Sequence, residues 1–189
     1  MAADYQMQLP PTTLDSADEQ TRPLLQQAQD KLGFVPRMYE GMAKVPGVLG
    51  TYMHGYQHFR EDSGFSPPEQ EVVLLTISRL NGCGYCMSAH SMLADKVSQV
   101  PAEVIEAIRN DEPIPDRRLA ALSRFTRVMF ETRGMPTQAD VQAFLDAGFE
   151  EHQVLQIILA LAVKTLSNYS NHVNHPELDE AFADHAWQG

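Results

Sequence analysis

The chain has 189 residues, of which 43% are hydrophobic and 21% are charged, as is typical of a globular protein with a buried core. Its net charge of −11 disfavours binding to nucleic acid or to an anionic membrane surface, where a basic patch is expected. No apolar run approaches the roughly 18 residues of a membrane span, and the first residues lack the features of a secretory signal, so we expect a cytoplasmic protein.

The first third of the sequence predicts a polar arm followed by three helices. Residues 1–16 contain prolines and few apolar positions, and we expect them to form a loose arm that docks on a neighbour. The pattern of apolar residues predicts helices over residues 17–32, 37–43 and 47–60, with Gly33 ending the first. The aromatic residues of the third helix are expected in the core. Tyr56 among them is a candidate for the wall of a pocket.

Residues 66–96 predict two helices that fold back on each other. Ser66-Pro67-Pro68-Glu69 is typical of a capped helix start, and Asn81-Gly82 is typical of a turn. The second helix carries Cys83 and Cys86, which are the only cysteines of the chain. Few cysteines in a chain that we expect in the cytoplasm favour redox or metal chemistry over a structural disulfide.

The spacing of these residues permits an activated thiol. Positions three and four apart share a helix face, so Cys83, Cys86 and His90 form one stripe if Cys83 opens a helix. Two positions three apart have Cβ atoms about 5–6 Å apart, which permits a disulfide after a modest adjustment. The helix N-terminus and a nearby imidazolium both favour the thiolate. Antiparallel helices also bring Glu71 within one turn of His90. The pattern therefore permits a relay from Glu71 through His90 to Cys86, with Cys83 as the resolving thiol.

The rest of the chain predicts further helices and no strand. Helices are expected over residues 101–110, 117–133, 138–147 and 150–173, with a short one in the acidic end at residues 176–189. Residues 157–163 are apolar on every side and are therefore expected to be buried, either centrally or between subunits. Lys164, Asn168 and His172 form a polar stripe, which is either a seam that satisfies helix ends or the lining of a cavity that faces the cysteines. We predict a single all-α domain over residues 1–189, with a long buried helix at 150–173.

The pattern Glu-x11-Cys-x2-Cys-x3-His, with LGFVPRMYEGMAKVPGV, DRRLAAL and KTLSNYSNHV around it, resembles a known family. It is similar to the alkylhydroperoxidase D (AhpD)-like core of the carboxymuconolactone decarboxylase superfamily, and to its longer, peroxidase-related branch, from about Leu32 to His172. The resemblance implies an AhpD-like helical bundle that forms homo-oligomers. It also implies that Cys86 reduces peroxide, that Cys83 is its partner, and that His90 and Glu71 relay protons. AhpD members carry a second histidine inside the CxxC, where this chain has Tyr85.

The function predicted from these residues is a thiol-dependent hydroperoxide reductase. Its substrate is expected to be a small hydroperoxide or another hydrophobic electrophile, and its reductant an external dithiol of the thioredoxin or lipoyl type. Tyr85, Asn168, His172 and Tyr56 are candidate pocket residues. No phosphate-binding loop is present, so no dissociable cofactor is expected.

Four alternatives remain open at this point. The thiols can serve a thiol-disulfide switch or reductase partner without peroxidase activity. Cys83, Cys86, His90 and Glu71 can ligate zinc, although a structural zinc site usually has two ligand pairs far apart in sequence. A lactone decarboxylase is a further alternative, although such members of the family typically lack the CxxC. The last is a pair of inert buried thiols.

Overall fold

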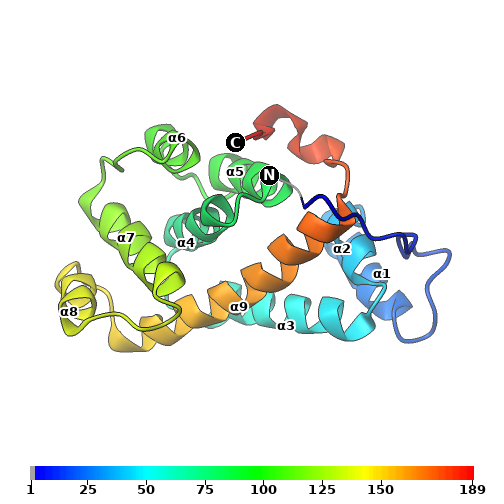
Figure 1. Ribbon diagram of the computed structural model, residues 1–189, viewed down its shortest axis with the longest axis horizontal. Coiled ribbons are helices and arrows are strands. Elements are labelled where there is room, and N and C mark those ends of the chain that lie inside the picture. The colour runs from blue at the N-terminus through cyan, green and yellow to red at the C-terminus, as the bar shows by residue number, and fades with distance from the viewer. Residues whose placement is uncertain (1–2) are drawn as a thin grey trace.

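The computed structural model describes residues 3–189, which form nine α-helices and one 3-10 helix (Figure 1). No strand occurs within these residues, and the predicted all-α fold is confirmed. In chain order the helices are α1 (Arg22–Leu32), α2 (Arg37–Met42), α3 (Pro46–Asp62), α4 (Pro67–Leu80), α5 (Gly84–Lys96), α6 (Ala102–Asn110), α7 (Arg117–Glu131), α8 (Gln138–Asp146), α9 (Glu151–Asn174) and the 3-10 helix η1 (Glu180–His185).

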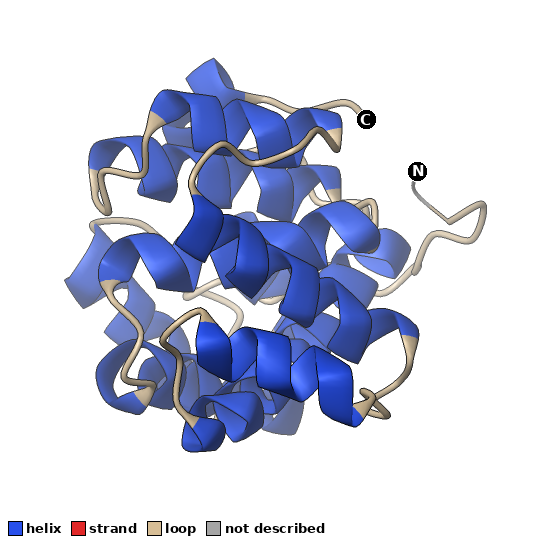
Figure 2. Cartoon of the chain, turned by 90° about the vertical axis from the view of Figure 1, so that its left-hand side faces the viewer, coloured by secondary structure: helices blue, strands red, loops and turns tan. Residues whose placement is uncertain are grey.

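The longest helix, α9, crosses most of the molecule, with α3 lying along it and α1 and α2 at one end (Figure 1). Helix α4 is central, because it contacts α3, α5, α6, α7 and α9. All residues from Val72 to Leu75 on α4 are fully buried, and four consecutive positions cover every face of a helix, so this part of α4 is enclosed on all sides. Figure 2 shows the same arrangement from the side, with helices throughout and only loops between them.

Two hydrophobic clusters fill the interior. The larger one packs α4 against α6, α7, α8 and the first half of α9. The smaller one lies among α1, α2, α3 and α5, and it contains both Cys83 and Cys86. The two thiols are therefore part of a packed core, and their chemistry depends on what the neighbouring helices place around them.

The helix boundaries follow local signals. Helix α1 begins at Arg22 and not at residue 17 as predicted, because Pro23 prefers the first turn and the Asp18 carboxylate accepts hydrogen bonds from the backbone N–H groups of Gln20 and Thr21 before it. The acidic end of the chain forms the short 3-10 helix η1, which packs on α5.

The face of α9 that the sequence predicted to be buried is partly open in the single chain. Ile157, Ala160 and Val163 are buried, but Ile158 is 44% exposed. Leu155, at 68%, and Tyr169, at 55%, extend this exposed face along the helix. A single chain therefore does not bury residues 157–163 on every side, and their burial between subunits stays a prediction.

The N-terminal arm lies on its own chain within the described residues. The backbone N–H groups of Ala3 and Met7 donate hydrogen bonds to the carbonyls of His172 and Val173 at 3.3 and 2.7 Å, and that of Thr12 to the carbonyl of Glu40 at 3.0 Å. The arm thus follows the C-terminal end of α9 and reaches α2. The arm is therefore not loose over residues 3–12, its docking on a neighbour stays a prediction, and residues 1 and 2 lie outside the described part of the chain.

Candidate functional site

The α4–α5 hairpin presents the cysteines at the start of a helix. Glu69 accepts a hydrogen bond from the backbone N–H of Ser66 at 2.8 Å, which completes a capping box at the start of α4. Gly82 has φ +65°, a left-handed conformation that glycine adopts without strain, and it turns the chain between the helices. Cys83 is the N-cap of α5, and Cys86 lies in the first turn of that helix.

Both thiols are free, and each is only 1% exposed. The Asn171 side chain of α9 lies across them, because its Nδ2 atom is 3.6 Å from Cys83 Sγ and 3.3 Å from Cys86 Sγ, within hydrogen-bonding distance of both. Cys86 Sγ also lies 3.9 Å from the Met38 Sδ atom of α2. The two sulfurs share one environment, as a pair that exchanges between dithiol and disulfide requires.

The surroundings separate the acidities of the two thiols. Burial by itself would raise the pKa of Cys86, but a hydrogen bond from Cys83 and the charge of Lys164 outweigh it and lower the pKa to about 6. The hydrogen bond to Cys86, followed by burial, raises the pKa of Cys83 well above its ordinary value. Cys86 is therefore the thiolate of the pair at pH 7, and Cys83 keeps its proton.

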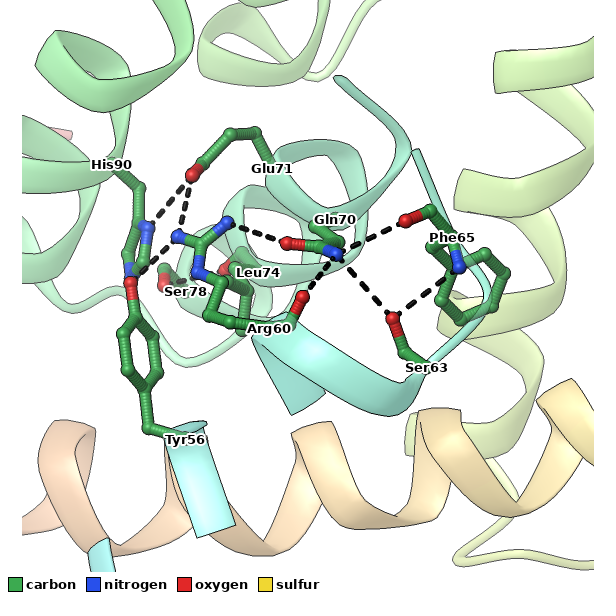
Figure 3. A network of polar contacts seen from close by, with 9 residues as sticks. All are labelled: Tyr56, Arg60, Ser63, Phe65, Gln70, Glu71, Leu74, Ser78 and His90. Carbon is green, nitrogen blue, oxygen red and sulfur yellow. Dashed lines mark hydrogen bonds and ion pairs between the residues drawn. The ribbon is translucent and has the colours of Figure 1, made fainter. Parts of the chain in front are cut away.

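A buried network on α3, α4 and α5 holds His90 (Figure 3). Glu71, 1% exposed, contacts His90 Nδ1 at 2.9 Å through one carboxylate oxygen and accepts a hydrogen bond from Arg60 at 2.5 Å through the other. Arg60 also donates to Tyr56 at 2.6 Å and to Gln70 at 3.1 Å. Burial would raise the pKa of Glu71, but His90 and Arg60 hold it below its ordinary value, so Glu71 is a carboxylate.

The imidazole of His90 is neutral at pH 7. Burial, followed by the charge of Lys164, lowers the pKa of His90 to about 4, although the Glu71 carboxylate opposes this. The expectation that an imidazolium favours the thiolate is therefore wrong, because His90 carries no charge where Cys86 is ionised. Over residues 3–189, no hydrogen bond joins His90 to either sulfur. The structure brings together the Glu71 and His90 half of the predicted relay, and its last step to Cys86 stays a prediction.

The four candidate pocket residues lie in three different places. His172 and Tyr85 line a cavity of about 410 Å³ that reaches Cys83 from the side of α9 and the C-terminal segment. The Tyr85 hydroxyl bonds the Asp179 carboxylate, so it points away from the thiols toward η1. Tyr56 lies elsewhere, on a cavity of about 200 Å³ that it shares with Arg60.

Asn168 is fully buried on α9, and its Oδ1 atom accepts a hydrogen bond from Asn81 at 2.8 Å. Within the described part of the chain, residues 3–189, its Nδ2 atom has no hydrogen-bond partner, and neither has the Nε2 atom of His172. The polar stripe of α9 therefore serves both predicted roles. Asn168 accepts a hydrogen bond from the turn before Cys83, as a seam that satisfies helix ends would, and His172 borders the cavity that opens at Cys83.

Two residues that reach the site were not assigned from the sequence. Asn171 contacts both sulfurs, and Arg60 contacts Glu71. The spacing of Asn171 from Lys164 and Ser167, seven and four residues, places all three on one helix face, and this periodicity could have identified it. Arg60 had no comparable pattern, because its contact depends on how α3 crosses α4.

The chain resembles known proteins in sequence over one segment and in fold over almost its whole length. The family model described as "Carboxymuconolactone decarboxylase family" matches residues 46–126. This segment of the chain is therefore similar to the carboxymuconolactone decarboxylase family, and it covers less than half of the 189 residues. The matched segment runs from α3 into α7, so it includes the cysteines, His90 and Glu71, whereas Lys164 and Asn171 of α9 lie outside it. No curated protein sequence matches the chain.

Solved structures share the fold over almost the whole chain. An uncharacterized peroxidase-related protein from Ralstonia eutropha JMP134, described as an alkylhydroperoxidase AhpD core, is 22% identical with a TM-score of 0.80, over 95% of this chain and 96% of that one. An uncharacterized peroxidase-related protein from Silicibacter sp. TM1040 is 20% identical with a TM-score of 0.75, over 97% and 98%. A variant of the debrominase Bmp8 in complex with 2,3,4-tribromopyrrole is 15% identical with a TM-score of 0.75, over 95% of both chains.

Two further observations bear on the alternatives. Within residues 3–189, no group of three or more His, Cys, Asp or Glu side chains is arranged to hold a metal ion, so the geometry gives the zinc alternative no support. The helices of the described chain also include none with the length and apolar character that crossing a membrane requires.

Proposed function

We propose that the protein is a thiol-dependent hydroperoxide reductase in which Cys86 is oxidised and Cys83 resolves the product. The observation that carries this proposal is the pair of free, buried thiols under one Asn171 amide, with Cys86 ionised at pH 7 and Cys83 protonated. A low-pKa thiolate beside a protonated thiol is the arrangement that a two-cysteine peroxidase needs.

The reaction proceeds in two balanced steps. The Cys86 thiolate attacks the terminal oxygen of a hydroperoxide ROOH, the O–O bond breaks, and Cys86 becomes a sulfenic acid while RO⁻ leaves and takes up a proton to give ROH. The Cys83 thiol then attacks the Cys86 sulfur, so that a disulfide forms and one water molecule departs. An external dithiol restores both thiols by exchange and is itself oxidised to a disulfide. Such a cycle suits a reducing, cytoplasmic compartment.

Glu71 and His90 act on this reaction through orientation. The contact at Nδ1 with Glu71 fixes the imidazole ring and leaves Nε2 as the nitrogen able to accept a proton. Because His90 is neutral, we propose that it serves as a base in the second step, when the Cys83 thiol loses its proton.

The test is stopped-flow oxidation of the reduced protein by cumene hydroperoxide and by hydrogen peroxide, following the loss of thiols. We expect two thiols to be lost per peroxide, an undetectable rate in Cys86→Ser, and a sulfenic acid that persists in Cys83→Ser. A rate no faster than that of a free thiol would reject the peroxidase. Oxidation of both thiols by a disulfide reagent, reversed by a dithiol, would then identify the protein as a thiol-disulfide switch.

One observation favours a second candidate function, the reductive removal of a halogen from an aromatic ring. Cys83 borders a cavity of about 410 Å³, large enough for a small ring, and the debrominase Bmp8 has the same fold. In this reaction an aryl bromide and two thiols give the debrominated ring, a disulfide, and bromide with one proton. Bromide release from a brominated pyrrole, without comparable peroxide consumption, would select this function.

We also propose that the protein forms a homo-oligomer through the exposed apolar face of α9, which Leu155, Ile158 and Tyr169 form. Leu155 and Tyr169 are each more than half exposed, which is costly for large apolar or aromatic side chains in a lone chain. The same face in a second copy is the occupant that we propose, since homo-oligomers most often pair identical surfaces.

A further inference from the structure

Lys164 is a cation buried in the core of the described chain. The side chain lies on α9 and is 1% exposed, which is rare for lysine. Among residues 3–189, its Nζ atom has no hydrogen-bond partner. Removing an ammonium group from water without pairing it is strongly unfavourable, so either an opposite charge offsets this cost or the group loses its proton. The question is which neighbouring group can supply that charge.

The groups on which the charge of Lys164 acts differ in whether they can carry a negative charge. Its charge acts on Cys83, Cys86 and His90, the three groups of the α5 stripe. His90 is neutral at pH 7, and Cys83 keeps its proton. The carboxylate of Glu71 is already bonded to Arg60 and His90. Of the three groups on which the charge of Lys164 acts, Cys86 is the one that can hold a negative charge at pH 7.

We propose that Lys164 is the counter-ion of Cys86 in the reduced protein, and that it supplies the proton which the oxygen leaving Cys86 requires. The first half stands on the structure alone, while the second rests on the proposed peroxidase function. Lys164 thereby takes the place that an imidazolium was expected to fill. Its charge stabilises the Cys86 thiolate, and as the donor of the proton to the leaving oxygen it is also a catalytic acid.

The polar face of α9 supports this assignment by its composition. Lys164, Ser167 and Asn171 are all buried on the same side of the helix, and Asn171 reaches both sulfurs. Buried polar side chains are as a rule hydrogen-bonded. Ser167 bonds the carbonyls of Val163 and Lys164 in its own helix, whereas Lys164 and Asn171 need a partner on another element. The thiolate is that partner, since Asn171 donates to its sulfur and Lys164 neutralises its charge.

Oxidation removes the anion of this pair and leaves Lys164 alone in the core. The reduced site holds Cys86–S⁻, Lys164–NH₃⁺ and Cys83–SH, with no net charge. After reaction with ROOH the products are the disulfide, ROH, water and Lys164–NH₂, so charges and protons balance without uptake from solvent. The cost of an unpaired buried ammonium drives the transfer of the proton from Lys164 to RO⁻. Reduction by a dithiol returns the proton to Lys164.

A thiolate titration tests the counter-ion without any peroxide. In a Cys83→Ser background, where the serine hydroxyl can still donate to Cys86, ultraviolet thiolate absorbance and iodoacetamide alkylation report Cys86 alone. The other titratable groups around Cys86 and Lys164 stay fixed near neutral pH. Burial raises the pKa values of the neighbouring tyrosines, whereas that of His90 lies at about 4; the tyrosines are Tyr39, Tyr52, Tyr56 and Tyr85. Arg60 and Glu71 remain a charged pair.

The variant Lys164→Met keeps the shape of the side chain and removes its charge. The Cys86 pKa of about 6 is expected to rise at least to that of a free thiol. The thiolate fraction at pH 7 then falls from about 90% to about 3%, and alkylation slows about 30-fold. Lys164→Arg should restore most of the rate. Lys44→Met, on a lysine whose Nζ bonds Asn174 away from the sulfurs, should leave it unchanged.

A titration midpoint in Lys164→Met equal to that of its parent would overturn the counter-ion. Should this variant not fold, as circular dichroism would show, Lys164→Gln provides the same test with a neutral polar side chain. For the proton transfer, a pH-indicator dye should record no net proton uptake when the wild type is oxidised by peroxide at pH 7. Uptake of one proton per peroxide would overturn the proposed proton transfer from Lys164 to the leaving oxygen. A protein that ignores peroxide but shows the shifted titration would refute the peroxidase and keep the counter-ion.

Discussion

Neutralising Glu71 tests whether the His90 network is built on a buried charge. The substitution Glu71→Gln keeps the size of the side chain and leaves Arg60 and His90 facing an amide in place of a carboxylate. Removing one partner of a fully buried ion pair costs about 3–5 kcal/mol. Arg60 is 22% exposed and keeps its bonds to Tyr56 and Gln70, so we take the lower end, about 3 kcal/mol.

The matched control is Glu69→Gln, on the same helix. Glu69 also pairs with an arginine, Arg118, at 2.7 Å, but the Arg118 side chain is 44% exposed. Glutamine can replace glutamate in a capping box, so this variant loses only a partly solvated pair, which is worth about 1 kcal/mol or less. Urea unfolding of both variants at pH 7 is the assay. With a slope of about 2 kcal/mol per molar, Glu71→Gln should lower the urea midpoint by about 1.5 M, whereas Glu69→Gln should lower it by about 0.5 M or less. Equal shifts in the two variants would refute the reasoning.

Three further predictions concern the thiols, the imidazole and α9. Asn171→Leu removes the donor to both sulfurs and should slow alkylation of Cys86 at pH 7 about tenfold, while Asn174→Leu, one turn away, should not. His90 has a folded pKa of about 4, below that of the unfolded chain, so its contribution to stability is present above pH 6.5 and is lost as pH falls toward 4. We expect the wild type to lose about 2 kcal/mol of unfolding free energy between pH 7 and pH 5 through this residue. Urea unfolding of His90→Gln at pH 7 and at pH 5 should lack this loss. Replacing Leu155 and Ile158 together by Glu should give monomers in analytical ultracentrifugation, and a wild type that already sediments as a monomer would contradict the oligomer.

The helices of the fold could be predicted from the sequence because their signals are local. The capping box at Ser66 and the turn at Asn81-Gly82 fixed the hairpin that carries the cysteines. The hydrogen bond between Glu71 and His90 followed from the antiparallel geometry of two adjacent helices. The contacts of α9 with the site could not be derived in this way, since Asn171 lies 85 residues from Cys86 in the chain and no local pattern fixes how α9 crosses α5.

The protonation state of His90 could not be predicted from the sequence either. A histidine one turn from a cysteine predicts an imidazolium, because position alone cannot say how deeply the ring is buried. The structure buries His90 beside a cation and an already occupied carboxylate, and both its burial and Lys164 favour the neutral ring. A neutral imidazole cannot stabilise the Cys86 thiolate by charge, so the stabilising charge has to come from another element. Helix α9 supplies it, and the acidity of a thiol on α5 therefore depends on a residue that lies outside the matched family segment.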